Sequence, residues 1–176
     1  MRKLANEELD RISIEEFKEV DKLPIVILLD NIRSLNNVGS AFRTSDAFLV
    51  EKIYLGGITG TPPHREIQKT ALGATESVDW EHAPNPLTLI NKLKADGYKI
   101  ISIEQVEKSI SLSDFSPVDN EKYCLVFGNE VFGVDQEVVN ASDLCIEIPQ
   151  HGTKHSLNIS VSLGVVVWDF YSKLKR

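Results

Sequence analysis

The sequence predicts an α/β fold with a mostly parallel six-stranded sheet flanked by helices. Apolar runs typical of buried strands recur at residues 25–30, 52–56, 77–81, 99–103, 122–127 and 144–148. Segments with helical periodicity separate most of these runs, at residues 38–48, 65–72, 86–95 and 136–141. Strands that alternate with helices in this way are typical of a sheet whose strands run parallel.

The start of the chain predicts a helical extension in front of this sheet. Residues 6–20 carry Leu9, Ile12 and Phe17 on an approximate apolar stripe, which predicts a short amphipathic helix. With 176 residues the chain is long enough for one domain and too short for two ordinary ones. We therefore expect an N-terminal helical extension, residues 1–22, and a single domain, residues 23–176.

Two loops and a last helix complete the predicted order of elements. Residues 61–64 and 109–120 have the composition of loops, with prolines in both. The last helix, from Ser156 to about Lys173, is apolar on most of its circumference, so it must be covered on every side. Its own domain or a second subunit could supply that cover, and we favour partial burial against a second subunit.

Composition bears on location and on cysteine chemistry. No stretch reaches the ~18 uncharged apolar residues of a transmembrane helix, and the N-terminal sequence MRKLANEELDRIS lacks the apolar core of a signal peptide. We expect a cytoplasmic protein without membrane contact. Cys124 and Cys145 each lie in an apolar strand pattern without CxxC spacing, so we expect buried reduced thiols.

The most informative segment is residues 148–170, where a polar loop runs directly into an apolar helix. Ser156, Leu157 and Asn158 put a hydroxyl and a carboxamide where the helical pattern begins and where backbone N–H groups lack partners. Taken alone, these residue types favour ordinary N-capping over a ligand site.

Two further segments place polar residues after apolar strands. In the run NVGSAFR, Asn37 and Arg43 bracket the first turns of a helix beside the carboxyl end of a strand, where open α/β sheets bind ligands. In residues 123–134 a strand ends at Gly128, and Glu130 follows two residues later. A glycine at such a point lets the backbone approach a ligand closely.

In this order and with these residues, the three segments resemble motifs 1, 2 and 3 of the SpoU (TrmH-like) branch of the SPOUT RNA methyltransferases. The resemblance runs from about residue 24 to about residue 171 and includes KTALGA at residues 69–74. It implies a C-terminal deep trefoil knot, an exception to the rule that chains do not thread loops. It also implies methyl transfer from S-adenosylmethionine to a ribose 2′-hydroxyl of tRNA or rRNA, by a homodimer with its pocket near the interface.

The resemblance also assigns the catalytic residues. It implies that Arg43 contacts the phosphate of the target nucleotide, and because arginine has a pKa above about 12 we interpret it as a phosphate clamp rather than a base. Asn37 would hold Arg43 and the ribose in register. Glu130 and Asn158 would structure the pocket, and Ser156 would lie near the cofactor or the hydroxyl.

The cofactor is expected to be held mainly by backbone groups, because an adenine edge and a methionine zwitterion can be bound by N–H and C=O groups without charged side chains. This points to Gly128 and Asn129 in motif 2, to Ile148 and Gln150 around motif 3, and to Leu157 as an apolar wall. Many relatives carry methionine where this chain has Gln150, so the detail of the pocket differs here.

The overall charge is an argument against RNA binding. Lys and Arg total 19 against 26 Asp and Glu, a formal net charge of −7, although phosphate contacts normally supply much of the affinity for nucleic acids. Basic side chains do lie in or near the motif loops, and a local basic patch would suffice. The RNA-binding residues that we predict are Arg33, His64, Arg65 and Lys154.

Less specific explanations of the motif residues remain open. Arg43 could pair with Asp46 on the surface, Asn37 and Ser156 could be plain caps, and Glu130 could be a solvated turn residue. For the whole chain, the alternative is a non-catalytic knotted domain that binds RNA or acts as an assembly factor.

A metal site is the other alternative that the sequence raises. His151 and His155 have the i, i+4 spacing of helical metal ligands, but Gly152 and Thr153 intervene and no third ligand is in sight. We therefore expect a loop at these residues and no metal.

Overall fold

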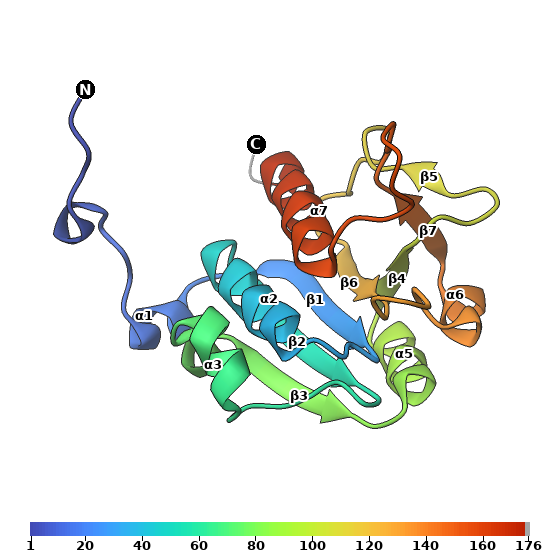
Figure 1. Cartoon of the computed structure of the whole chain (residues 1–176), viewed down its shortest axis with the longest axis horizontal. Coiled ribbons are helices and arrows are strands. Elements are labelled where there is room, and N and C mark those ends of the chain that lie inside the picture. Colours follow the sequence, from blue (N-terminus) through green and yellow to red (C-terminus); the bar gives the residue numbers. More distant parts are fainter. Residues whose placement is uncertain (175–176) are drawn as a thin grey trace.

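Parallel strands form one continuous sheet through the middle of the molecule (Figure 1). The structure, a computed structural model, describes residues 1–174. The strands lie in the order β3-β2-β1-β6-β4-β7-β5 and are β1 (Leu23–Asp30), β2 (Val50–Gly56), β3 (Asp79–Ala83), β4 (Tyr98–Ile103), β5 (Ile110–Ser111), β6 (Lys122–Phe127) and β7 (Leu144–Glu147). The helices are the 3-10 turn η1 (Asn6–Glu8), α1 (Ile14–Glu19), α2 (Leu35–Ala47), α3 (Arg65–Ala71), α4 (Ala74–Ser77), α5 (Pro86–Ala95), α6 (Gln136–Ala141) and α7 (Ile159–Leu174).

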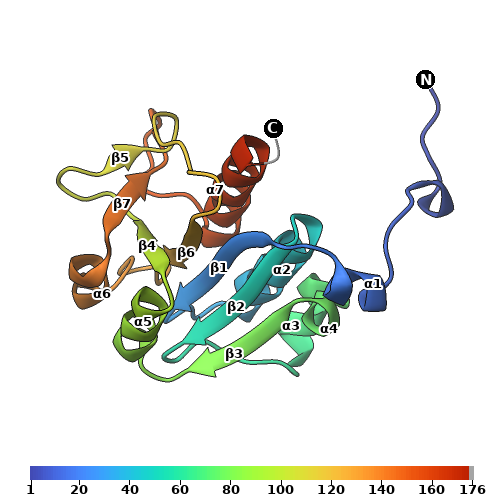
Figure 2. The same cartoon turned by 180° about the vertical axis from the view of Figure 1, so that it is seen from behind.

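Helices cover both faces of the sheet (Figures 1 and 2). Ile25, Ile27 and Leu29 of β1 pack into the core beneath α2, α3 and α7. Val26 and Leu28, which point the other way, pack beneath α5 and α6. Burial on both sides explains why β1 is an uninterrupted apolar run rather than an alternating one.

The predicted α/β fold with a parallel sheet is confirmed, with small shifts. All six predicted strands are present, but β3 starts two residues late because residues 74–77 form α4. The described residues contain a seventh strand, β5, within the segment predicted as a loop. A strand of two residues is too short to produce a recognisable pattern.

The predicted helix over residues 6–20 is wrong. The chain forms η1 and then, separately, α1, because Asp10 adopts a left-handed conformation with φ 46° and Ser13 starts a new helix through a capping box with Glu16. Of the predicted stripe only Phe17 is buried, whereas Leu9 and Ile12 are exposed. Residues before α1 extend away from the sheet in both views (Figures 1 and 2).

The last helix begins three residues later than predicted, at Ile159, and packs against α2. Leu163, Val167 and Phe170 are fully buried on its inner face. Its outer face is left open by this chain: Val161, Val165 and Trp168 are 49%, 39% and 55% exposed. Complete burial within its own domain is therefore excluded. Among residues 1–174, the chain contains no helix with the length and hydropathy needed to span a bilayer.

Candidate active site

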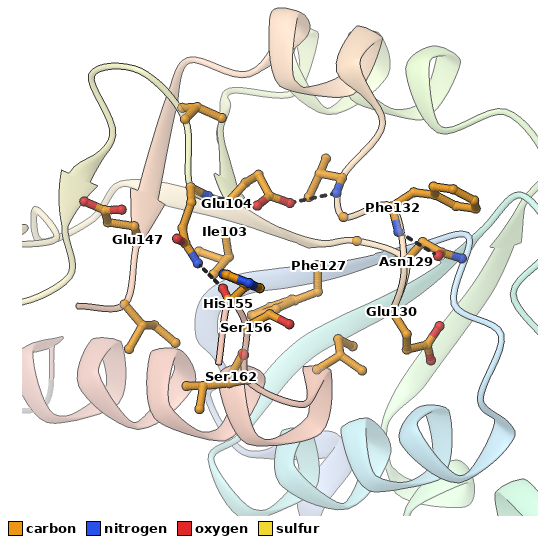
Figure 3. A pocket seen from close by; sticks show the side chains of 18 of the residues that line it. Ile103, Glu104, Phe127, Asn129, Glu130, Phe132, Glu147, His155, Ser156 and Ser162 are labelled. Carbon is orange, nitrogen blue, oxygen red and sulfur yellow. Dashed lines mark hydrogen bonds between the residues drawn. The ribbon is translucent and has the colours of Figure 1, made fainter. Parts of the chain in front are cut away.

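The loops that follow β4, β6 and β7 enclose a cavity of about 760 Å³ together with the first turn of α7 (Figure 3). It lies at the carboxyl ends of parallel strands, the edge of an α/β sheet where ligands bind. Its volume is within the ~300–1,000 Å³ typical of small-molecule and cofactor sites.

The cavity is acidic. Glu104, Glu130 and Glu147 contribute to its lining, and none of the described residues that line it is a lysine or arginine. Carboxylates in a partly enclosed space favour a cation and oppose phosphate groups. The cavity therefore suits a positively charged ligand better than a nucleotide or dinucleotide.

Three distant segments of the chain meet at the edge of this cavity through side-chain amides. The Asn158 amide nitrogen Nδ2 donates to Asn37 Oδ1 at 3.3 Å, and Asn37 Nδ2 donates to Glu130 Oε1 at 3.0 Å. Because an ionised carboxylate only accepts, Asn37 must turn its NH₂ group toward Glu130 and its oxygen toward Asn158. The sequence separations are 93 and 121 residues, so this network joins all three motifs.

Glu130 is the most strongly held member of the network. Its carboxylate also accepts hydrogen bonds from the backbone N–H groups of Arg33 and Ser34, each at 3.0 Å. Burial alone would raise the pKa of Glu130, but the hydrogen bonds from Arg33, Asn37 and Ser34 outweigh burial and lower the pKa below its ordinary value. Glu130 therefore lies in an exposed turn, and its ionised carboxylate also links motif 2 to motif 1.

Neither Asn37 nor Ser156 is a helix cap. The cap of α2 is Ser34, whose hydroxyl accepts the Asn37 N–H, so α2 begins earlier than predicted. At α7, Asn158 takes this role, because its Oδ1 accepts the Ser160 N–H at 2.8 Å. Ser156 lies before the helix and lines the cavity.

The motif 2 loop is closed on itself. Asn129 and Gly133 exchange backbone hydrogen bonds of 2.9 Å in both directions, and Asn129 Nδ2 donates to the Asn31 carbonyl at 2.7 Å. A Cβ on Gly128 would come within 2.1 Å of the Gly133 carbonyl carbon. The glycine therefore allows a close contact within its own loop, and its expected contact with the cofactor stays a prediction.

Two side chains after β4 hold the cavity together and were missed in the sequence. Glu104 Oε2 accepts the Val134 N–H at 3.0 Å, and Gln105 Nε2 donates to the His155 carbonyl at 2.9 Å (Figure 3). The first fixes the motif 2 loop and the second the loop before Ser156. Their position directly after a predicted strand was a usable signal, because the carboxyl ends of neighbouring parallel strands share one edge.

The structure brings most of the predicted site residues together. The cavity lining includes all of the expected cofactor residues, namely Gly128, Asn129, Ile148, Gln150 and Leu157. It also includes three expected catalytic residues, Glu130, Ser156 and Asn158. Asn37 lies behind them in the network, outside the lining. Their functional roles stay predictions.

Arg43 stands apart from the other catalytic candidates. It is exposed on α2, six residues after Asn37 and hence about 9 Å farther along the helix axis, and it is not part of the cavity lining. The Asp46 carboxylate accepts a hydrogen bond from the Ser77 hydroxyl, and in the described part of the chain no ion pair joins it to Arg43. The surface ion pair is therefore excluded.

The predicted RNA-binding residues are spread over the surface. Arg33 lines a hollow beside the cavity, and Lys154 is exposed in the loop before Ser156. His64 caps α3 through its ring nitrogen, and Arg65 is the exposed first residue of that helix. They lie on three separate segments of the chain.

Among the residues that the structure describes, the cysteines and histidines form neither a disulfide nor a metal site. Cys124 is fully buried, which raises the pKa of its thiol, and Cys145 is half-buried rather than buried as expected; both are free. Within residues 1–174, no three side chains of the types that bind metals come together as a metal site.

Comparison with known proteins places this geometry in a family. The model described as the SpoU rRNA Methylase family matches residues 24–168. The chain belongs to the SpoU rRNA methylase family. This match spans the sheet, the cavity and the three motifs.

Individual SpoU relatives agree with the assignment. A tRNA (guanosine(18)-2′-O)-methyltransferase of Borreliella burgdorferi is 28% identical over 152 residues, which are 86% of this chain and 68% of that protein. The crystal structure of the A. aeolicus TrmH/SpoU tRNA modifying enzyme has a TM-score of 0.79 at 26% identity, covering 91% of this chain and 81% of that one. The AdoMet-bound rRNA methyltransferase of Sinorhizobium meliloti has a TM-score of 0.80 at 23% identity, covering 89% and 59%.

Proposed function

We propose that this SpoU-family chain transfers the methyl group of S-adenosylmethionine to a ribose 2′-hydroxyl of transfer RNA. The observation that carries the proposal is the hydrogen-bonded network of Asn37, Glu130 and Asn158, which joins the three motifs at the edge of an acidic cavity. The name of the Borreliella burgdorferi relative supports transfer RNA as the substrate.

The cavity fits the cofactor by charge and by lining. S-adenosylmethionine carries a sulfonium and an ammonium group, and Glu104, Glu130 and Glu147 supply the opposite charge. Ile148 and Leu157 offer apolar contacts, and backbone groups of the Gly128 loop can bind polar edges. The bound cofactor supplies an electrophilic methyl group; the acidic lining opposes the phosphates of NAD or ATP.

The protein's own part of the chemistry is positioning. Asn37, oriented by Glu130, and Asn158, which caps α7, fix the ends of two helices at the cavity. Ser156, at the cavity wall, is placed to hydrogen-bond the ribose or the cofactor. Arg43 contacts the phosphate of the target nucleotide and organises its charge. Alignment of hydroxyl and methyl group then supplies much of the acceleration.

We also propose that the working form is a homodimer that buries the outer face of α7. Val161, Val165 and Trp168 recur at i, i+4 and i+7 and form an exposed apolar stripe. Light scattering should give about twice the 19.7 kDa chain mass, and Val165→Asp should halve it while circular dichroism stays unchanged. A monomeric wild type would refute this assembly.

Family membership supports three further proposals. The C-terminal part forms the deep trefoil knot, residues 1–22 form an extension before the methyltransferase domain, and the enzyme acts in the cytoplasm. In the structure, α7 follows β7 and packs on α2.

Cofactor binding and methyl transfer test the proposed function directly. Titration calorimetry should show micromolar binding of S-adenosylmethionine, roughly −8 kcal/mol, and no comparable binding of NAD or ATP. Incubation of unmodified tRNA transcripts with methyl-labelled cofactor, followed by nucleoside mass spectrometry, should yield a 2′-O-methylnucleoside. RNA binding without cofactor binding or transfer would instead support the non-catalytic knotted domain.

A further inference from the structure

A second hollow, of about 450 Å³, opens beside the cofactor cavity. Its wall includes Arg33, Ile58 and Phe132, and its floor is the end of β1 at Asp30 and Asn31. The two spaces share Asn129, Phe132 and Gly133, so one wall separates them. A ligand in the hollow would therefore lie directly next to the cofactor.

Phe132 is displayed at this shared wall by a rigid loop. The Asn129 side-chain oxygen Oδ1 accepts the N–H groups of Val131 and Phe132 at 2.9 and 3.2 Å, and the backbone bridge from Asn129 to Gly133 closes the turn. Yet Phe132 is 83% exposed, and in Figure 3 its ring points outward, away from Phe127. Hydrogen bonds therefore fix the loop in a conformation that leaves this large aromatic ring exposed to solvent.

The other walls of the hollow combine an apolar surface with charged groups of both signs. Ile58 is 70% exposed and provides a second apolar surface. The Asp30 and Asp135 carboxylates in the lining oppose an anion inside the hollow. Arg33 is the basic residue of the lining, and no ion pair within the described residues occupies it.

We propose that this hollow binds the unstacked base of the target nucleotide, with the Phe132 ring as its stacking platform and Arg33 as a contact for a flanking phosphate. Proteins that act on single nucleotides in RNA stack splayed-out bases on aromatic side chains. A base held here places its ribose at the wall shared with the cofactor cavity. The inference rests on the proposed function, and it assigns substrate binding to a residue outside the expected catalytic set.

The test compares a normal tRNA transcript with one that carries an abasic ribose at the methylated position. On the normal transcript, Phe132→Ala should lower kcat/KM by about 5-fold to 150-fold, the range for loss of one stacked base, and Phe132→Trp should stay near wild type. On the abasic transcript, wild type should be as slow as Phe132→Ala is on the normal transcript. Phe132→Ala should lower kcat/KM on the abasic transcript no further. Val118→Ala, a truncation of an apolar residue that is 54% exposed in a loop outside both spaces, is the matched control.

Wild-type activity and calorimetric cofactor binding separate this inference from the proposed function. If wild type transfers no methyl group, the proposed function fails first. If wild type is active but Phe132→Ala slows methyl transfer to both transcripts equally, Phe132 is a structural residue and the inference is overturned. If the substitution weakens cofactor binding by the same factor, Phe132 is a cofactor residue; if it halves the mass in light scattering, Phe132 is an interface residue. Either result also overturns the inference. An unchanged rate on the normal transcript would overturn it as well.

Discussion

The two halves of the sheet differ in what lies against their strands. In the half formed by β1, β2 and β3, helices α2 and α3 pack directly on the strands, and Gly39 lets them approach so closely that a Cβ would meet Thr70 Oγ1 at 2.1 Å. In the half formed by β4, β6 and β7, loops leave a cavity and are fixed by bonds such as that from Gln105 to His155. Strands of both halves contribute to the apolar core, but directional hydrogen bonds shape the loops at the edge of the second half, so stability and function should respond to different substitutions.

The largest expected effect is a truncation in the packed half. Phe42 on α2 is fully buried, so Phe42→Ala should lower the free energy of unfolding by about 3–5 kcal/mol through lost burial and a cavity. The exposed Phe132→Ala should change it by less than about 0.5 kcal/mol. Urea denaturation measures both, and equal losses would show that the two phenylalanines do not differ as the structure requires.

Substitution of Arg43 tests whether methyl transfer can be lost while the packing of the core stays intact. It is exposed on α2, so Arg43→Ala should leave the melting temperature and cofactor affinity near wild type while lowering methyl transfer by ~10² or more. Arg43→Lys keeps the charge but loses the two-point fork, so it should restore little of the rate. Full activity of Arg43→Ala on a tRNA that wild type methylates would contradict the assignment.

Gln105 tests the hydrogen-bonded half. Gln105→Ala removes the donor to the His155 carbonyl, so the loop before Ser156 should loosen and the KM for S-adenosylmethionine should rise about 10-fold. Gln105→Glu keeps the size but lacks the donor and should behave alike. Initial rates over a range of cofactor concentrations measure the effect. A normal KM with a lowered melting temperature would mean that Gln105 serves only stability.

The smallest effect concerns the pH dependence of the tie at Glu130. Because the pKa of Glu130 is lowered in the folded protein, its stabilisation is present above the ordinary value of 4.5 and is lost as pH falls through the lower folded pKa. Glu130→Gln should therefore be less stable than wild type by about 1 kcal/mol at pH 7, and the difference should shrink below pH 4.5. Urea midpoints at both pH values give the comparison, and a constant difference would disagree with it.

Periodicity predicted the packed half well and the hydrogen-bonded half only in part. The run at residues 24–29 and the helix at Arg65–Ala71 follow from burial, which leaves a pattern in neighbouring residues. The pairing of Asn37 with Glu130 across 93 residues leaves no such pattern. Only the resemblance to a family predicted that both residues belong to one site. Gln105 lies in neither a periodic pattern nor a family motif, and only its position after the strand predicted at residues 99–103 pointed to it.

Local backbone choices account for the remaining errors. At Asp10 a left-handed residue ends a helix that its apolar stripe would continue, and at Ser34 a cap starts α2 before the apolar pattern begins. Both depend on single hydrogen bonds or dihedral angles rather than on averages over a window. The two-residue β5 depends only on its neighbour β7, so tertiary pairing decides it.

The network that joins Asn37, Glu130 and Asn158 has a consequence for how the protein is made. Contacts across 93 and 121 residues are costly to form early in folding, because the chain between them must first be ordered. During synthesis, a nascent chain whose Asn158 has not yet emerged from the ribosome lacks the hydrogen bond between Asn158 and Asn37. Competence for the reaction should therefore arrive all at once, when Asn158 has left the ribosome and can reach Asn37, rather than grow with chain length.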